Sequence, residues 1–234
     1  MCLPICSCPT FGCKSLLAAV LLLTTATPAG AFSLAFPGPA AAADAGVRTL
    51  SAETRRVADW VAGSHDNRGL PYIILDKADA RLFLFDGGGA LQASVPALIG
   101  AATGDDSVPG IGSRRLAAIR SAERTTPAGR FLATLGHDSS GEDLLWVDYD
   151  TAIALHRASD RKPGMTAKSR VDRLATRTSA DNRASYGCIG VTTAFYDGFI
   201  RPAFAAGGIV YVLPETRTAT AEFRIPAAAT TTGD

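Results

Sequence analysis

The stretch Tyr72–Gly89, YIILDKADARLFLFDGGG, carries the clearest structural pattern in the sequence. Its two apolar runs, Tyr72–Leu75 and Arg81–Phe85, are rich in β-branched, leucine and aromatic residues, and each is followed by aspartate or glycine residues. Short runs bounded by turn-forming residues predict two strands of a meander. Because so short a connection leaves no room for a crossover helix, we expect antiparallel pairing.

Further strands are predicted by the same kind of pattern. They are Leu91–Ile99, where Pro96 marks an edge or a bulge, and Leu144–Tyr149, Thr151–His156 and Ile209–Leu213. The expected fold is therefore mainly β, an antiparallel β-sandwich or barrel with one or two short helices.

Two stretches show helical spacing instead. In Ser51–Ala62 the apolar residues Val57, Trp60 and Val61 fall on one face, so we expect an amphipathic helix with Trp60 anchored in the core. A second helix should begin after Thr192 or Thr193, with Phe195 and Phe199 on one face and Pro202 stopping or kinking it.

The first 31 residues have the order of a secretory signal peptide. Lys14 precedes the apolar run Leu16–Leu23, and the small residues Ala29-Gly30-Ala31 follow. This order is typical of a segment that is removed on export, and the run is too short to span a bilayer. The alternative is a cytosolic protein with a disordered leader. We expect an exported protein of the periplasm or cell envelope.

The rest of the chain divides by composition. We expect a flexible Ala- and Pro-rich spacer at 32–50, the folded domain at 51–215, and a loosely ordered tail at 216–234. Without Lys14 the chain has 22 basic and 22 acidic residues, which argues against nucleic acid or an anionic membrane as a partner. The sequence clusters no metal ligands, so we expect neither a metal nor a cofactor.

Cys188 is the candidate nucleophile, within Ser185-Tyr186-Gly187-Cys188-Ile189-Gly190-Val191. Cys2, Cys6, Cys8 and Cys13 precede the apolar run and leave with the leader, so Cys188 has no partner for a disulfide within the chain. A lone thiol in an exported protein is a candidate for covalent catalysis. The alternatives are a buried structural thiol and a disulfide between two chains, although we expect a monomer.

His156, at the end of a predicted strand, is the candidate base. The alternative is a histidine with satisfied hydrogen bonds at a strand end. His65 precedes the domain and His137 lies in a polar turn, so both are weaker candidates.

Two loops stand out. Gly100–Gly112 is rich in glycine but lacks the Gly-Lys-Ser/Thr ending of a phosphate loop, so we expect a mobile surface loop. Arg157–Ala184 has eight basic and three acidic residues, a net charge of +5. It is either a solvated lid or a surface that attracts an acidic substrate and favours the thiolate of Cys188.

Three motifs now carry a resemblance. Ser185–Ile189 resembles the S-x-G-C-[IV] signature of the L,D-transpeptidase family of exported cysteine enzymes. Thr126–Phe131 resembles the family's T-P-x-G-x-[FY] element, which we expect to be structural, and Ile153–His156 resembles the strand that ends in its histidine. The resemblance covers about Pro71 to Pro214. Tyr186 and Gly190 depart from the family pattern, in which His and then Arg or Asn are common.

The resemblance implies the catalytic type of this β fold and a reaction on peptidoglycan stem peptides. Cys188 would attack the L-centre carbonyl of the diamino acid in a stem tetrapeptide, release D-alanine and pass the acyl group from a thioester to an amine. His156 would be the base and Ser185 would hold the loop or orient His156. The backbone N–H groups of Tyr186, Gly187 and Cys188 would bind the oxyanion.

Substrate carboxylates would meet Arg173 and Arg183, and carbapenems would acylate Cys188. An L,D-carboxypeptidase that uses water as the acceptor, or a wall-binding protein with eroded catalysis, are the alternatives.

Overall fold

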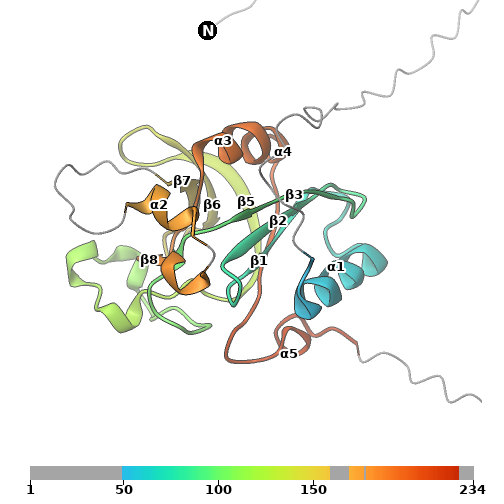
Figure 1. Ribbon diagram of the computed structural model, residues 1–234, viewed down its shortest axis with the longest axis horizontal. Coiled ribbons are helices and arrows are strands. Elements are labelled where there is room, and N and C mark those ends of the chain that lie inside the picture. The colour runs from blue at the N-terminus through green and yellow to red at the C-terminus, as the bar shows by residue number, and fades with distance from the viewer. Residues whose placement is uncertain (1–48, 159–168, 177, 227–234) are drawn as a thin grey trace, which may run out of the picture. The chain divides into compact units, whose positions relative to one another are not determined.

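The computed structural model describes residues 49–158, 169–176 and 178–226 (Figure 1). Its main sheet has eight strands in the order β3-β2-β1-β10-β5-β6-β7-β9. Their bounds are β1 Tyr72–Asp76, β2 Arg81–Phe85, β3 Leu91–Pro96, β5 Gly129–His137, β6 Asp143–Asp148, β7 Ile153–Arg157, β9 Ile189–Val191 and β10 Gly208–Val212. Two further strands, β4 (Ile99–Gly100) and β8 (Arg183–Ser185), form a parallel pair of their own.

The helices are short apart from the first. The α-helices are α1 Ala52–Ser64, α2 Arg170–Leu174, α3 Thr193–Phe195, α4 Arg201–Ala203 and α5 Ala219–Phe223. Single turns of 3-10 helix are η2 Ile111–Ser113, η3 Leu116–Ala118, η4 Ser121–Glu123 and η5 Ser179–Asn182, and η6 Tyr196–Ile200 is a π-helical turn. Among the described helices, none is long and apolar enough to cross a membrane.

The sheet is nearly closed on itself. Leu98, just after the edge strand β3, exchanges two backbone hydrogen bonds of 2.7 and 3.0 Å with Gly190 of the other edge strand, β9. Pairing is antiparallel at five of the seven contacts of the main sheet and parallel at β1–β10 and β7–β9. The prediction of a mainly β, largely antiparallel fold with few short helices is confirmed.

Both faces of the central strands are buried, which explains their continuous apolar runs. Ile73 and Leu75 point to the cluster inside the curved sheet, whereas Tyr72 and Ile74 point to a second cluster under α1 and α5. Trp60 of α1 contributes to this second cluster as predicted, with its ring 6.1 Å from that of Tyr211.

The start of α1 is fixed by side chains. Ser51 caps the helix by accepting from the N–H of Thr54 at 3.1 Å. The hydroxyl groups of Ser51 and Thr54 also donate to the carboxylate of Asp76, at the end of β1, at 2.6 and 3.0 Å. These hydrogen bonds tie the helix to the first hairpin.

The predicted second helix exists, and it ends at Ala203, one residue after Pro202. Thr192 caps α3, and Phe195 stacks on Phe199 at 5.1 Å as the spacing indicates. The π-helical turn η6 follows, and the helical stretch continues through α4, which contains Pro202 near its start. Prolines and π-helical turns are both common causes of helix kinks, so the irregular stretch around Pro202 agrees with the predicted effect of this proline.

The chain after Glu215 differs from the expectation. Residues 216–226 are placed and include α5, so the prediction of a loosely ordered tail is wrong for this part. Phe223 and Ile225 pack on the second cluster, and the N–H groups of Glu215 and Thr216 both donate to Asp105 at 2.8 Å. The predicted signal peptide at 1–31, most of the predicted spacer at 32–50, and 227–234 lie outside the described residues.

Candidate active site

Cys188 and His156 come from neighbouring strands. Strand β7 pairs with β9 in parallel, with Leu155 opposite Ile189 and His156 opposite Gly190. Because side chains alternate along a strand, Cys188 projects from the same face as Gly190 and therefore as His156. Both side chains line one cavity of about 300 Å³. The structure thus brings the predicted nucleophile and base together.

The hydrogen bond of His156 determines what its ring can do. Its Nδ1 lies 2.8 Å from the carbonyl oxygen of Arg157, so Nδ1 carries the hydrogen and Nε2 keeps its lone pair. Burial, the largest effect, lowers the pKa of His156, and nearby Arg170 acts in the same direction. The imidazole is therefore neutral near pH 7 and able to accept a proton.

Arg157 is itself held firmly. Its guanidinium donates to Asp143 of β6 at 2.9 Å and to Asp197 of η6 at 2.9 Å, and it lies over the ring of Tyr196 at 4.3 Å. The residue whose carbonyl orients His156 is therefore fixed to two other elements of the fold.

The thiol of Cys188 is neutral in this environment. The residue is half-buried, and its sulfur lies 3.7 Å from the carbonyl oxygen of Ala152. Burial raises the pKa of Cys188, while a backbone hydrogen bond from Ala154 and the charge of Arg170 lower it by less. Arg170, in the predicted basic segment, thus favours the thiolate as expected, but burial has the larger effect.

The loop before Cys188 is held by Ser185. Its hydroxyl donates to the carbonyl of Cys188 at 2.6 Å and accepts from the N–H of Gly187 at 3.0 Å. Gly187 has φ +130°, and a Cβ there would lie 2.7 Å from both Ile153 Cδ1 and Thr125 O. Only glycine fits this position. Of the two roles expected for Ser185, holding the loop is the one for which hydrogen bonds are found.

Thr126 fixes the same loop from the other side. Its hydroxyl accepts from the N–H of Gly100 at 2.8 Å and donates to the carbonyl of Gly187 at 2.8 Å. Thr126, the first residue of the motif Thr126–Phe131, therefore has the structural role that we expected for it.

Of the three backbone N–H groups expected to bind an oxyanion, one already has a partner. Gly187 uses its N–H for Ser185, which leaves the N–H groups of Tyr186 and Cys188. In the described part of the chain no acceptor is found for either. The ring of Tyr186 lies under the guanidinium of Arg124, 4.0 Å from its centroid.

A second cavity, of about 110 Å³, is also lined by Cys188. Its walls include Ile111, Gly112, Arg114, Leu116 and Ile119. Residues of the Gly100–Gly112 loop and of the segment after it therefore line this cavity, a role that the prediction of a mobile surface loop did not include. The reason is a tertiary contact that periodicity does not reveal: a Cβ at Gly112 would lie 2.4 Å from Asp150 O.

Arg114 is the charged residue of this wall that sequence reasoning missed. It pairs with buried Glu123 at 3.1 Å, and Arg120 pairs with the same carboxylate at 2.9 Å. The hydrogen bonds from Arg120 and then Arg114 lower the pKa of Glu123 to about 2. The only local sign of this charged residue was the pair Arg114-Arg115 in the sequence.

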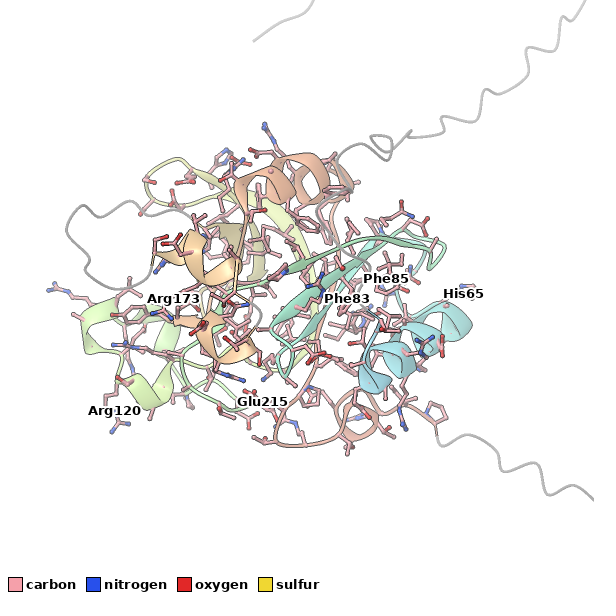
Figure 2. The ribbon with its side chains drawn as sticks, viewed as in Figure 1. His65, Phe83, Phe85, Arg120, Arg173 and Glu215 are labelled. Atoms are coloured by element: carbon pink, nitrogen blue, oxygen red, sulfur yellow. The ribbon has the colours of Figure 1, made fainter. Side chains whose placement is uncertain are left out.

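The two predicted substrate-binding arginines lie elsewhere. Arg183 forms an ion pair with Glu215, and Arg173 donates to the carbonyl of Asp181 at 2.9 Å. Neither lines the cavities beside Cys188. Figure 2 shows Arg173 on α2, and His65 at the far end of α1, on the opposite side of the domain. In the predicted lid, positions 161, 162, 168 and 177 lie outside the described residues.

Gly190 is covered by apolar side chains. A Cβ there would lie 3.3 Å from Leu98 and 3.6 Å from Ala158. Leu98, Ala158 and Leu174 form a small cluster. It holds α2 over the position at which the family pattern has Arg or Asn.

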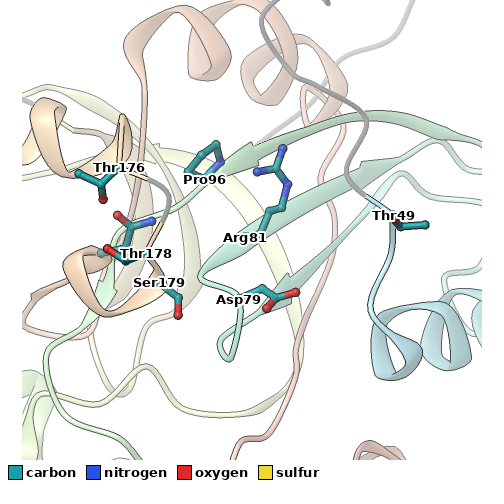
Figure 3. A pocket seen from close by; sticks show the side chains of 8 residues that line it. Thr49, Asp79, Arg81, Pro96, Thr176, Thr178 and Ser179 are labelled. Carbon is teal, nitrogen blue, oxygen red and sulfur yellow. The ribbon is translucent and has the colours of Figure 1, made fainter.

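A larger cavity, of about 380 Å³, lies between the β1–β2 hairpin and the α2–η5 segment (Figure 3). Arg81 in its wall donates to Ser94 at 3.1 Å. Its described lining contains neither cysteine nor histidine, so we do not assign the chemistry there. No group of three or more potential metal ligands occurs in the described ranges.

Comparisons with known proteins give a likeness of fold only. No model of a protein family matches the chain, and no curated protein matches it. Three of the similar solved structures are described here. The L,D-transpeptidase LdtMt1 in complex with imipenem is 13% identical, with a TM-score of 0.37 over 61% of this chain and 58% of that one. The Campylobacter jejuni helical cell shape determining protein Pgp2 is 16% identical, with a TM-score of 0.40 over 69% and 56%. The catalytic domain of the E. faecium L,D-transpeptidase is 17% identical, with a TM-score of 0.34 over 61% and 95%.

This chain thus spans just over half the length of the first two structures. Likeness at these identities and TM-scores assigns neither an activity nor a substrate to it.

Proposed function

We propose that the protein is an exported peptidoglycan L,D-transpeptidase with Cys188 as nucleophile. The observation that carries the proposal is the placement of Cys188 and His156 on one face of paired strands, in one cavity, with Nε2 of His156 able to accept a proton. A neutral thiol and a neutral imidazole that line the same cavity suit general-base activation of the sulfur.

The first half-reaction forms a thioester. Nε2 of His156 takes the proton of the Cys188 thiol as the sulfur attacks the L-centre carbonyl of the diamino acid. The oxyanion is stabilised by the N–H groups of Tyr186 and Cys188, and one such donor contributes about 3 kcal/mol in the transition state. His156 then gives its proton to the amine of D-alanine, which leaves.

The second half-reaction reverses these roles. An amine of a second stem peptide gives a proton to His156 and attacks the thioester. The thiolate leaves and takes the proton back from His156, so the site returns to its starting state. No cofactor enters either step.

The decisive test uses defined disaccharide-tetrapeptides with mass-spectrometric detection. D-alanine release together with cross-linked dimers supports the proposal. Release without dimers would indicate a carboxypeptidase. No reaction, with a thiol that titrates as accessible, would favour a wall-binding protein and refute an enzyme.

Acylation by a carbapenem tests the two residues separately. We expect a mass adduct that is absent in Cys188→Ala. In His156→Ala the acylation rate should fall by at least about a hundredfold, because the general base is lost. His137→Ala is the matched control: it removes an exposed histidine at the end of β5 and should leave the rate unchanged.

A further inference from the structure

Two aromatic rings form an exposed platform beside the site. Trp146 of β6 stacks on Tyr149, with ring centroids 4.6 Å apart and an angle of 26° between the planes. Tyr149 is 64% exposed. Gly136 of β5 lies against the indole, and a Cβ there would be 2.7 Å from Trp146 Cδ1. Glycine therefore makes room for the Trp146 ring at the strand surface.

Strand register places this platform relative to the nucleophile. Trp146 pairs with Ala154 of β7. Leu155 lies opposite Ile189 of β9, so its neighbour Ala154 lies opposite Cys188, which immediately precedes β9. Paired residues share a face, so Trp146 and Cys188 project from the same side. Two strand spacings separate them, about 10 Å. Trp146 also lines the 300 Å³ cavity that contains Cys188 and His156.

The chemistry of the platform fits a sugar ring. An aromatic face is electron-rich and attracts the C–H groups on one face of a pyranose. The hydroxyl and acetamido groups at the edge of the sugar need polar partners. Asp138, Glu142 and Asp143 line the same cavity. Asp143 already accepts from Arg157 and Asp138 from Ser140, but a carboxylate has about four acceptor sites and can take a further hydrogen bond.

The distance fits as well. In a stem peptide three residues lie between the sugar and the carbonyl that Cys188 would attack, and three extended residues span about 10 Å. A peptide with this carbonyl at Cys188 can therefore reach the platform with its sugar. We propose that Trp146 and Tyr149 form a saccharide subsite that binds the N-acetylated hexosamine bearing the stem peptide. This inference rests on the proposed function.

Binding tests it without turnover. In Cys188→Ala protein, a disaccharide-tetrapeptide should shift the indole N–H resonance of Trp146, whereas the free tetrapeptide should shift it much less. Trp60, the other tryptophan, is the internal control and should not respond. Equal shifts with both ligands would overturn the subsite. A sugar-dependent shift in a protein whose wild type releases no D-alanine would retain the subsite and refute the transpeptidase.

Kinetics provide the second measurement. The preference is the kcat/KM for the disaccharide-tetrapeptide divided by that for the free tetrapeptide. Tyr149→Ala should lower this ratio about fivefold, the size of one aromatic contact, and Tyr149→Phe should restore it. Leu132→Ala removes a side chain of β5 that is similarly exposed, at 65%, and should not change the ratio. An unchanged ratio in Tyr149→Ala would contradict the proposal.

Discussion

Replacing Lys77 by Met should destabilise the domain strongly. Lys77 is 1% exposed and donates three hydrogen bonds: to Gly104 O at 2.6 Å, Asp105 Oδ1 at 2.8 Å and Thr126 O at 3.0 Å. Without the ammonium group, the buried carboxylate of Asp105 loses its cationic partner. Breaking a buried ion pair from one side typically costs 3–5 kcal/mol. For a domain of this size that corresponds to a fall in Tm of about 10 °C.

Urea denaturation measures the free energy of unfolding, and Arg56→Met is the matched control. Arg56 pairs with Glu53 at 3.7 Å on the surface of α1, so its loss should cost about 0.5 kcal/mol or less. The double variant Lys77→Met/Asp105→Asn should be more stable than additivity predicts, because no buried charge is left alone. An additive double variant, or a loss below 1 kcal/mol in Lys77→Met, would refute the reasoning.

The pH dependence provides a second check on the same pair. Burial would raise the pKa of Asp105, but hydrogen bonds from Lys77 and Thr216 outweigh it and lower the pKa well below its usual range. A lowered carboxyl pKa adds stability above the unfolded value near 3.9, and this stability is lost as the pH falls towards the folded value. The loss between pH 5 and 2 should be smaller in Lys77→Met.

Three further results are expected. Alkylation of Cys188 by iodoacetamide should rise with pH to a midpoint above that of a free thiol, since burial raises its pKa; a midpoint below 8 would contradict this. Gly187→Ala should lower stability by about 1–3 kcal/mol and slow acylation, whereas Gly198→Ala, where nothing lies within 4 Å, should do neither. Thr126→Val should slow acylation and Thr126→Ser should restore it, because the hydroxyl bridges two loop segments; equal rates in the two variants would refute that role.

The local sequence pattern was sufficient to predict a strand where turn-forming residues marked both of its ends. The hairpin Tyr72–Asp76 to Arg81–Phe85 follows from its turn residues, and its register is as regular as the pattern indicates. Cys188 and His156 were found from their chemical type. Their common face is a consequence of the β7–β9 register, which depends on parallel pairing of segments more than 30 positions apart.

The missed features depend on distant partners. Strand β5 was not predicted, because Gly129–His137 lies mostly at intermediate or high exposure and pairs with β10 near the end of the chain. Arg183 was identified as a charge, but the carboxylate that holds it, Glu215, is 32 positions away. Counting charged residues in the sequence identifies an arginine but does not show which carboxylate it pairs with.

Arg157 has two roles, one through its backbone carbonyl and one through its side chain, and substitution of the residue does not separate them easily. Arg157 accepts the His156 ring hydrogen with its carbonyl, and its side chain anchors it to Asp143 and Asp197. The protonation chemistry is thereby coupled to a π-helical turn that does not line the cavities beside Cys188. On the proposed mechanism, a substitution at Asp197, which does not line the cavities beside Cys188, would therefore appear as slower turnover with unaltered affinity, and a surface carboxylate would be mistaken for a catalytic group.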